Sequence, residues 1–205
     1  MDRRGFMASA AAGAAVMGTG TTLKAETRRG GDSFSMHFAP HFGMFSAQAG
    51  NDPVAQLEFA ADAGFTAWED NGMKGRSVED QERIASAMDR LGMQMGVFVM
   101  NMGTAWGETF SRGDRGDREK FVNEAKESVE VAKRVNATWM TVVLGTRHPR
   151  IDLGYQTAYC VDQLRAAAEV LEPHGLVMVL EPLNPRDHPN MLLSEMGHAY
   201  EICRA

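Results

Sequence analysis

Glu181 is the residue of this sequence whose position best suits it for chemistry. It ends an apolar run, residues 176–180, and is followed at once by Pro182 and a polar loop. A carboxylate at the edge of a core is costly unless a cation, a metal ion or several hydrogen-bond donors meet it. Such a group can bind a hard divalent cation, Mg2+ or Mn2+, or remove a proton next to a carbonyl. A salt bridge to Arg147 or Arg186 is the structural alternative.

Other polar residues follow the remaining apolar runs of the sequence. The candidates for substrate contact among them are His41, Glu69, Asn101, His148 and Asn184. A structural hydrogen bond or a solvated loop position is an open alternative for each. If the apolar runs are parallel strands of a barrel, their ends lie on one face, which brings these side chains to the same side as Glu181.

A long loop, residues 103–116, follows the third apolar run and contains Arg112 and Arg115. Long loops with no secondary structure of their own often act as lids. The loop is therefore a candidate lid whose arginines bind a substrate carboxylate. A mobile, solvated loop is the alternative.

Alternating strands and helices must position these residues. Short runs rich in Val, Met, Phe or Trp predict strands buried on both faces, at residues 34–38, 65–69, 93–100, 138–144 and 176–181. Capping residues and helical spacing of apolar residues predict helices, at residues 53–63, 77–91, from Asp117 onward, 156–171 and from about Ser194. This repetition predicts parallel strands joined by crossovers.

The sequence favours a (β/α)8 TIM barrel over a doubly wound sheet. After the first run stands FAPHFGMF rather than a glycine-rich phosphate loop. A barrel takes about 250 residues, whereas 205 residues supply about five βα units, and residues 194–205 are still in helical register. We therefore expect a barrel truncated after about five units, with residues 31–205 as its N-terminal part.

The composition limits the expected partners. The chain has 21 basic and 27 acidic side chains and a net charge of -6, which argues against a nucleic-acid partner. No apolar run in residues 31–205 predicts a stable membrane anchor. We expect a small-molecule substrate, and a homo-oligomer is possible. Cys160 and Cys203 have no metal or redox spacing and fit buried apolar positions.

The first 30 residues form a separate segment. Arg3 and Arg4 precede a weakly apolar stretch, residues 8–19, and Ala25 is a possible cleavage position. This pattern resembles a twin-arginine export signal followed by a linker, and it predicts a periplasmic or otherwise extracytoplasmic protein. A disordered Ala/Gly-rich tail is the alternative.

Four stretches resemble the hydroxypyruvate isomerase family of xylose isomerase-like TIM barrels. They are MHFAPHFGMF, DAGFTAWEDNGM, AKRVNATWMTVVLG and, most specifically, GLVMVLEPLN. The resemblance implies isomerisation of hydroxypyruvate to tartronate semialdehyde through a metal-stabilised enediolate, with Glu181 as metal ligand and acid/base residue. Family members take their remaining ligands from later strands. Without those strands Glu181 lacks its partners and the edges of the first and fifth strands stay unpaired, so we expect these 205 residues alone to be inactive and prone to aggregate.

Three alternatives to this function stay open. A sugar or ketose epimerase of the same superfamily needs the same enediolate chemistry. An exported sugar-binding protein would keep the pocket but not the reaction. An abasic-site endonuclease is disfavoured by the acidic charge and by the scarcity of histidine in ligand positions.

Overall fold

The structure is a computed structural model that describes residues 34–205, so the predicted export signal lies outside the described residues. Its α-helices are α2 (Ser46–Ala49), α3 (Pro53–Asp62), α4 (Val78–Arg90), α5 (Arg115–Val135), α6 (Leu153–Leu171) and α7 (Met196–Arg204). Its strands are β1 (Ala67–Trp68), β2 (Gln94–Met95), β3 (Val97–Val99), β4 (Trp139–Val142) and β5 (Val177–Leu180). Two 3-10 turns, Met73–Gly75 and Glu172–His174, complete the elements.

The strands form two parallel ladders in chain order, one of β1 and β2 and one of β3, β4 and β5. β1 pairs with β2, β3 pairs with β4, and β4 pairs with β5, all in parallel. β2 and β3 are consecutive parts of one segment that passes through Gly96, whose N–H donates to the Trp68 carbonyl at 2.7 Å. A Cβ at residue 96 would lie 3.2 Å from that carbonyl oxygen. Glycine therefore permits the close approach that joins the two ladders.

The helices begin where their capping residues predict. Ser77 accepts a hydrogen bond from the Asp80 N–H at 3.1 Å, and Asp52 accepts one from Ala55. The long helix starts at Arg115, two residues before its predicted start, because Asp114 caps it through the Asp117 N–H. Each cap satisfies an N–H group that has no partner within the helix.

The prediction of a first strand at residues 34–38 is wrong. These residues form a bend and irregular backbone, and the chain first pairs with β1 further on, where His41 forms an isolated parallel bridge with Glu69. Phe34 instead packs against the ring of Phe65, with 4.9 Å between centroids. An apolar pattern makes a strand only where a neighbouring strand offers a ladder, and the two-residue β1 offers little of one.

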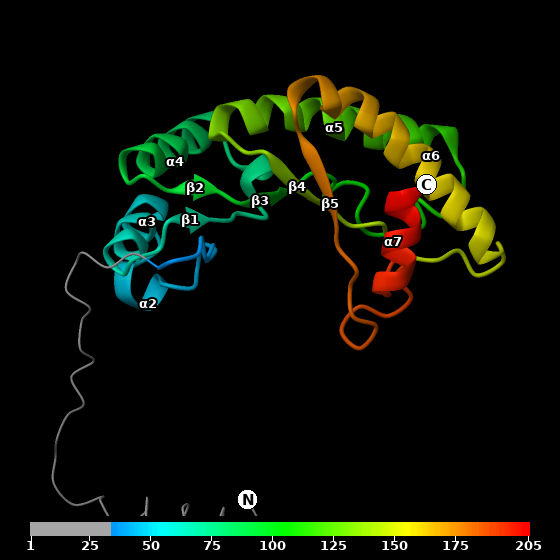
Figure 1. The fold of residues 1–205 in the computed structure, drawn as a ribbon, viewed down its shortest axis with the longest axis horizontal. Helices are drawn as coiled ribbons and strands as arrows, with labels where there is room; N and C mark the ends of the chain where they lie inside the picture. The colour runs from blue at the N-terminus through cyan, green and yellow to red at the C-terminus, as the bar shows by residue number, and fades with distance from the viewer. Residues whose placement is uncertain (1–33) are drawn as a thin grey trace, which may run out of the picture.

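Figure 1 shows the sheet curved into an arc, with α4, α5 and α6 along its convex side. The core lies between these two layers and contains Trp68, Phe98, Phe121 and Met140, all fully buried. The arrangement is an arc of parallel strands with helices along one side, so the predicted parallel α/β class is confirmed.

Alternation along the strands gives the sheet a second, concave face. Met140 and Met178 are register partners on the helical side, whereas Trp139, Val177 and Val179 alternate with them and are 46%, 45% and 41% exposed. This second face carries the side chains that would line the interior of a barrel.

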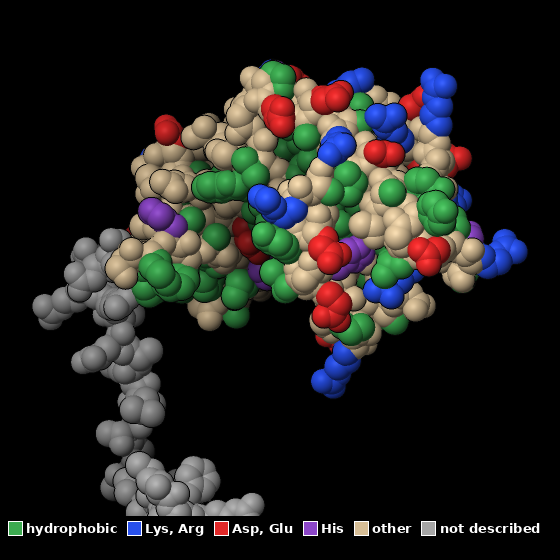
Figure 2. Space-filling view, turned by 45° about the vertical axis from the view of Figure 1, so that its right-hand side comes forward, with side chains coloured by type: hydrophobic (Ala, Val, Ile, Leu, Met, Phe, Trp, Pro, Cys, Tyr) green, Lys and Arg blue, Asp and Glu red, His purple; other side chains and the backbone are tan. Residues whose placement is uncertain are grey.

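The surface of the described residues mixes charges of both signs. On the face shown in Figure 2, Lys and Arg side chains lie among Asp and Glu side chains and between apolar ones. None of the helices formed by residues 34–205 combines the length and hydropathy that a bilayer span requires.

Candidate active site at the carboxyl ends of the strands

Glu181 follows β5 directly and falls, by alternation, on the same concave face as Val177 and Val179. Its N–H extends the ladder by donating to the Val142 carbonyl at 3.1 Å. Its carboxylate is exposed and makes no hydrogen bond or ion pair with any of residues 34–205. The structural alternative, a salt bridge to an arginine, is therefore not what this structure contains. The carboxylate is free to meet a ligand.

His41 and Glu69 are brought side by side. They form the parallel bridge at the edge of β1, and the Glu69 N–H donates to the Pro40 carbonyl at 3.0 Å. The Nδ1 of His41 lies 3.0 Å from the Phe42 carbonyl, so it carries the ring proton and leaves Nε2 as an acceptor in the neutral imidazole. Glu69 falls on the concave side, opposite in direction to the buried Trp68. Both residues are placed where a ligand at the strand ends could reach them.

Asn101 follows β3 but is fully buried. Its Nδ2 donates to the Val143 carbonyl at 2.8 Å, and its Oδ1 accepts from the Val143 N–H at 3.1 Å. The Asn101 side chain thus bonds both the N–H and the carbonyl of Val143, which lies just past β4. In this structure Asn101 holds two strand ends together rather than facing a ligand.

The loop of residues 103–116 is tied down at several points, which opposes its interpretation as a lid. The N–H of Gly103 donates to Glu124 at 2.7 Å, and Ser111 donates to the Thr146 carbonyl at 2.9 Å. Phe110 is fully buried against Phe121, with 4.8 Å between ring centroids. A loop that can open needs few such contacts.

The two loop arginines are held by acidic neighbours. Arg112 forms an ion pair with Asp117, and this bond, with smaller contributions from Asp114 and Glu108, raises the pKa of the Arg112 guanidinium. Arg115 is the first residue of α5 and pairs with Glu119 at 3.0 Å. Neither is placed beside Glu181 by any contact of the described residues.

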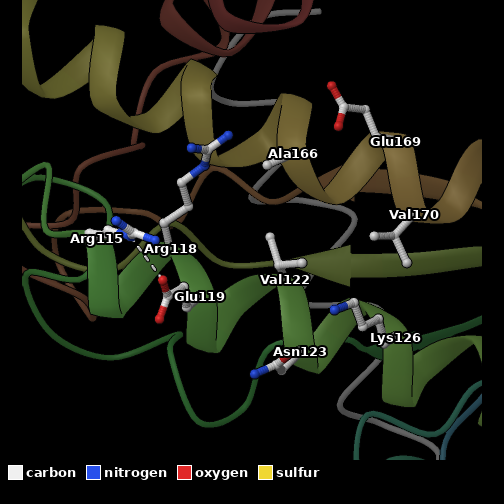
Figure 3. A pocket seen from close by; sticks show the side chains of 9 residues that line it. All are labelled: Arg115, Arg118, Glu119, Val122, Asn123, Lys126, Ala166, Glu169 and Val170. Atoms are coloured by element: carbon white, nitrogen blue, oxygen red, sulfur yellow. Dashed lines mark hydrogen bonds and ion pairs between the residues drawn. The ribbon is translucent and has the colours of Figure 1, made fainter.

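Arg115 also lines a cavity of about 740 Å3 between α5 and α6. Figure 3 shows Arg118 extending from α5 toward α6, with Glu169 on the far helix. This groove lies on the helical layer of the molecule, whereas Glu181 falls on the concave side. The prediction that Arg115 contacts the same substrate as Glu181 thus finds no support in this arrangement.

His148 and Asn184 lie in the loops after β4 and β5. The Nε2 of His148 is 3.8 Å from the Glu108 carboxylate, and the His148 side chain is 18% exposed. Asn184 is exposed and accepts a hydrogen bond from the Asp187 N–H at 3.0 Å, which shapes its own loop. His148 also lines a cavity, whereas Asn184 stabilises a turn.

Gly145 is a structural residue of the site region that the sequence analysis missed. It adopts φ +66, and a Cβ there would overlap the Gly107 carbonyl oxygen. The carbonyl of Gly145 accepts from Leu192, and the Thr146 N–H donates to Gly107. Three loops therefore converge on this one residue. The glycine directly after the run TVVL was the available signal, because a strand end that turns sharply needs positive φ.

The donors in the described residues do not complete a divalent-metal site. No group of three or more His, Cys, Asp or Glu side chains within residues 34–205 is arranged to hold a metal ion. Glu181 offers one hard oxygen ligand, whereas Mg2+ and Mn2+ bind to several.

Comparison with known proteins gives the family. The sequence profile described as xylose isomerase-like TIM barrel matches residues 57–205. A curated relative, the inosose isomerase of Halalkalibacterium halodurans, is 27% identical over 96 residues, which are 47% of this chain and 33% of that protein. The chain thus matches about a third of the length of this relative.

Three of the solved structures that share the fold each superpose on 82% of this chain. The family 2 AP endonuclease from Brucella melitensis has a TM-score of 0.67 at 20% identity and is covered over 63% of its length. The D-psicose 3-epimerase from Clostridium cellulolyticum H10, solved with D-tagatose, has a TM-score of 0.63 at 14% identity and is covered over 59% of its length. The IOLI protein, solved with a bound zinc atom, has a TM-score of 0.61 at 18% identity and is covered over 58% of its length. Identities this low establish the fold and nothing further.

Proposed function

The chain belongs to the xylose isomerase-like TIM barrel family, and from that premise we propose that the protein is an isomerase of a small hydroxy-carbonyl compound. The named candidate reaction is hydroxypyruvate to tartronate semialdehyde. The observation that carries the proposal is the carboxylate of Glu181, which is exposed at the carboxyl end of β5 and unpaired among residues 34–205. Barrel enzymes place their reacting groups at these strand ends.

Glu181 would act as the acid/base residue in this reaction. Its carboxylate removes a proton from C3 of hydroxypyruvate, which leaves an enediolate across C2 and C3. The same group returns the proton to C2, while a hydroxyl proton moves from O3 to O2. The C3 alcohol becomes an aldehyde and the C2 ketone becomes an alcohol, so no atom or electron enters or leaves.

A divalent metal is a further part of the proposal, with Glu181 as one ligand. The zinc in the related IOLI structure supports metal use in this fold. A metal bound next to an enediolate stabilises its negative charge. Mg2+ or Mn2+ is the proposed ion, since the ligand offered here is a hard oxygen.

An epimerase is the close alternative, because inverting a carbon beside a carbonyl uses the same proton removal. The likeness to a D-psicose 3-epimerase supports it through the fold.

An abasic-site endonuclease is a further alternative, because the fold is similar to that of the Brucella melitensis structure. The net charge of -6 opposes it. A ligand-binding protein without catalysis is distinguished from all three by the absence of turnover.

The test is steady-state turnover by the protein in its natural length, on hydroxypyruvate and on a panel of free ketoses. Preference for hydroxypyruvate supports the proposal, and preference for a ketose with inversion at C3 overturns it in favour of an epimerase. Glu181→Gln should lower kcat at least a hundredfold, since acid/base groups contribute about 10²–10⁴-fold. Glu172→Gln, at the other end of β5, is the matched control. Its glutamate is also exposed.

A further inference from the structure

A separate cavity of about 580 Å3 lies beside the carboxyl end of β4. We call it the β4-end cavity. Its polar lining comes from three loops: Glu108 from the loop after β3, Arg147 and His148 from the loop after β4, and Asn190 from the loop after β5. Glu181 is not among the residues that line it. The cavity is therefore a second place where polar groups from several strand ends converge.

The imidazole of His148 has a fixed orientation in this cavity. Its Nδ1 accepts a hydrogen bond from the Arg150 N–H at 3.1 Å, so the neutral ring carries its proton on Nε2. Nε2 lies 3.8 Å from the Glu108 carboxylate, which is beyond hydrogen-bonding distance. A donor and an acceptor thus face each other across a gap, and each can still bind a ligand group.

The loop that carries His148 is held rigid from beneath. Gln156 is 3% exposed, and its Oε1 accepts from the His148 N–H at 2.9 Å. Its Nε2 donates to the His148 carbonyl at 3.1 Å and to the Ile151 carbonyl at 2.5 Å. The Arg147 N–H in turn donates to the Asn190 carbonyl at 2.9 Å. A site whose main chain is fixed loses little conformational entropy on binding.

The charges of the cavity point to an anion that also carries a hydroxyl group. Arg147 makes no side-chain hydrogen bond or ion pair with residues 34–205, and its loop segment, residues 146–150, has no acidic residue. A guanidinium and an imidazole N–H together suit a carboxylate. The Glu108 carboxylate can only accept, so it suits a hydroxyl donor.

We propose that the β4-end cavity binds a small hydroxy acid, with its carboxylate on Arg147 and His148 and its hydroxyl donating to Glu108. The cavity does not contain Glu181, so this inference stands or falls independently of the isomerase proposal. It assigns a recognition role to Arg147 and Glu108 and directs His148 toward the carboxylate end of the ligand.

The test is an NMR titration of the natural protein with D-glycerate, following the amide signals of Arg147, His148 and Asn190. Saturable shifts of these signals are expected. Arg147→Gln should weaken binding about tenfold or more, since hydrogen bonds to charged groups are the strong ones. Arg150→Gln removes the same charge three residues away and should change affinity less than about twofold, because Arg150 does not line the cavity. Equal losses in both variants, or no saturable shift, would overturn the proposal.

Two further arms separate a hydroxy acid from other anions. Propionate lacks hydroxyl groups and should bind more weakly than D-glycerate. Glu108→Ala should abolish that preference, because the hydroxyl then has no acceptor and a negative charge is removed. If inorganic phosphate binds the same residues more tightly than D-glycerate, the site recognises charge alone and the hydroxy-acid assignment is wrong. Glu181→Gln should leave D-glycerate binding unchanged, which keeps this test separate from the test of catalysis.

Discussion

β4 and β5 are adjacent parallel strands of equal length and similar apolar sequence, yet their environments differ. WMTV of β4 has three of its four residues buried, whereas in VMVL of β5 none is buried. β4 has a neighbour on each side, and β5 pairs only with β4 among residues 34–205. The apolar pattern predicted that both strands are buried on both faces. Burial is therefore a property of the neighbours, which the pattern of one strand does not contain.

The largest contrast is expected at the glycines that flank these strands. Gly145 after β4 and Gly175 before β5 have φ +66 and +67, but of the two only Gly145 has a neighbour, the Gly107 carbonyl oxygen, that an added Cβ would overlap. Gly145→Ala should cost about 4 kcal/mol or more, because three loops must move. Gly175→Ala should cost about 1–2 kcal/mol, the backbone penalty alone. Urea unfolding measures both, and equal losses would show that the contact at Gly145 is easily relieved.

A smaller contrast is expected between register partners on the helical side. Met140 is fully buried and Met178 is partly exposed, and they lie side by side in the ladder. Met140→Ala should lower the free energy of unfolding by about 2–4 kcal/mol through the lost contacts and the cavity. Met178→Ala should cost about half as much or less, since water already reaches the side chain. A larger loss at Met178 would mean that β5 is covered in solution.

The concave face gives a third contrast, which also tests self-association. Thr141 is 8% exposed and its register partner Val179 is 41% exposed. Thr141→Lys should destabilise by several kcal/mol by burying a charge, whereas Val179→Lys should stay within about 1 kcal/mol. We expect Val179→Lys to reduce self-association, because β5 is an edge strand among residues 34–205 and a charged side chain on an edge strand discourages pairing with another copy. Light scattering measures self-association, and an unchanged value in Val179→Lys would show that copies do not meet at β5.

The smallest effect on stability at neutral pH concerns the two thiols. Burial, with a smaller contribution from Cys203, raises the pKa of Cys160 to about 12 from its ordinary 9.0. The unfolded chain loses this proton near pH 9 and the folded chain keeps it, so stability falls as the pH rises from 9 to 12, by up to about 1.4 kcal/mol per unit.

Iodoacetamide at pH 8 should label the exposed Cys203 quickly and Cys160 only on unfolding. Rapid labelling of Cys160 would show that α6 opens locally.

The local part of the fold was predictable, because its signals act within a few residues. Ser77 and Asp52 cap their helices through N–H groups three residues on, so the helix starts could be read from the sequence. Residues 34–38 could not be assigned in this way, since strand formation depends on a partner far away in the chain.

The candidate site was predictable in its position rather than in its contacts. Glu181 lies at a strand end, as expected from one apolar run and the residue after it. The Asn101 side chain bonds Val143, 42 residues further along the chain. The Gln156 side chain bonds the loop of His148, 8 residues earlier. Such pairings become visible only when the sheet brings the loops together.

The most direct test of the proposed chemistry is proton exchange at the reacting carbon. The natural protein in D2O, supplied with hydroxypyruvate and Mn2+, should catalyse deuterium incorporation at C3, which mass spectrometry of the quenched substrate detects. Glu181→Gln should reduce this exchange to the uncatalysed rate, and Glu172→Gln should leave it unchanged. Exchange that persists in Glu181→Gln would contradict the account, because the proton would then be moved by another group.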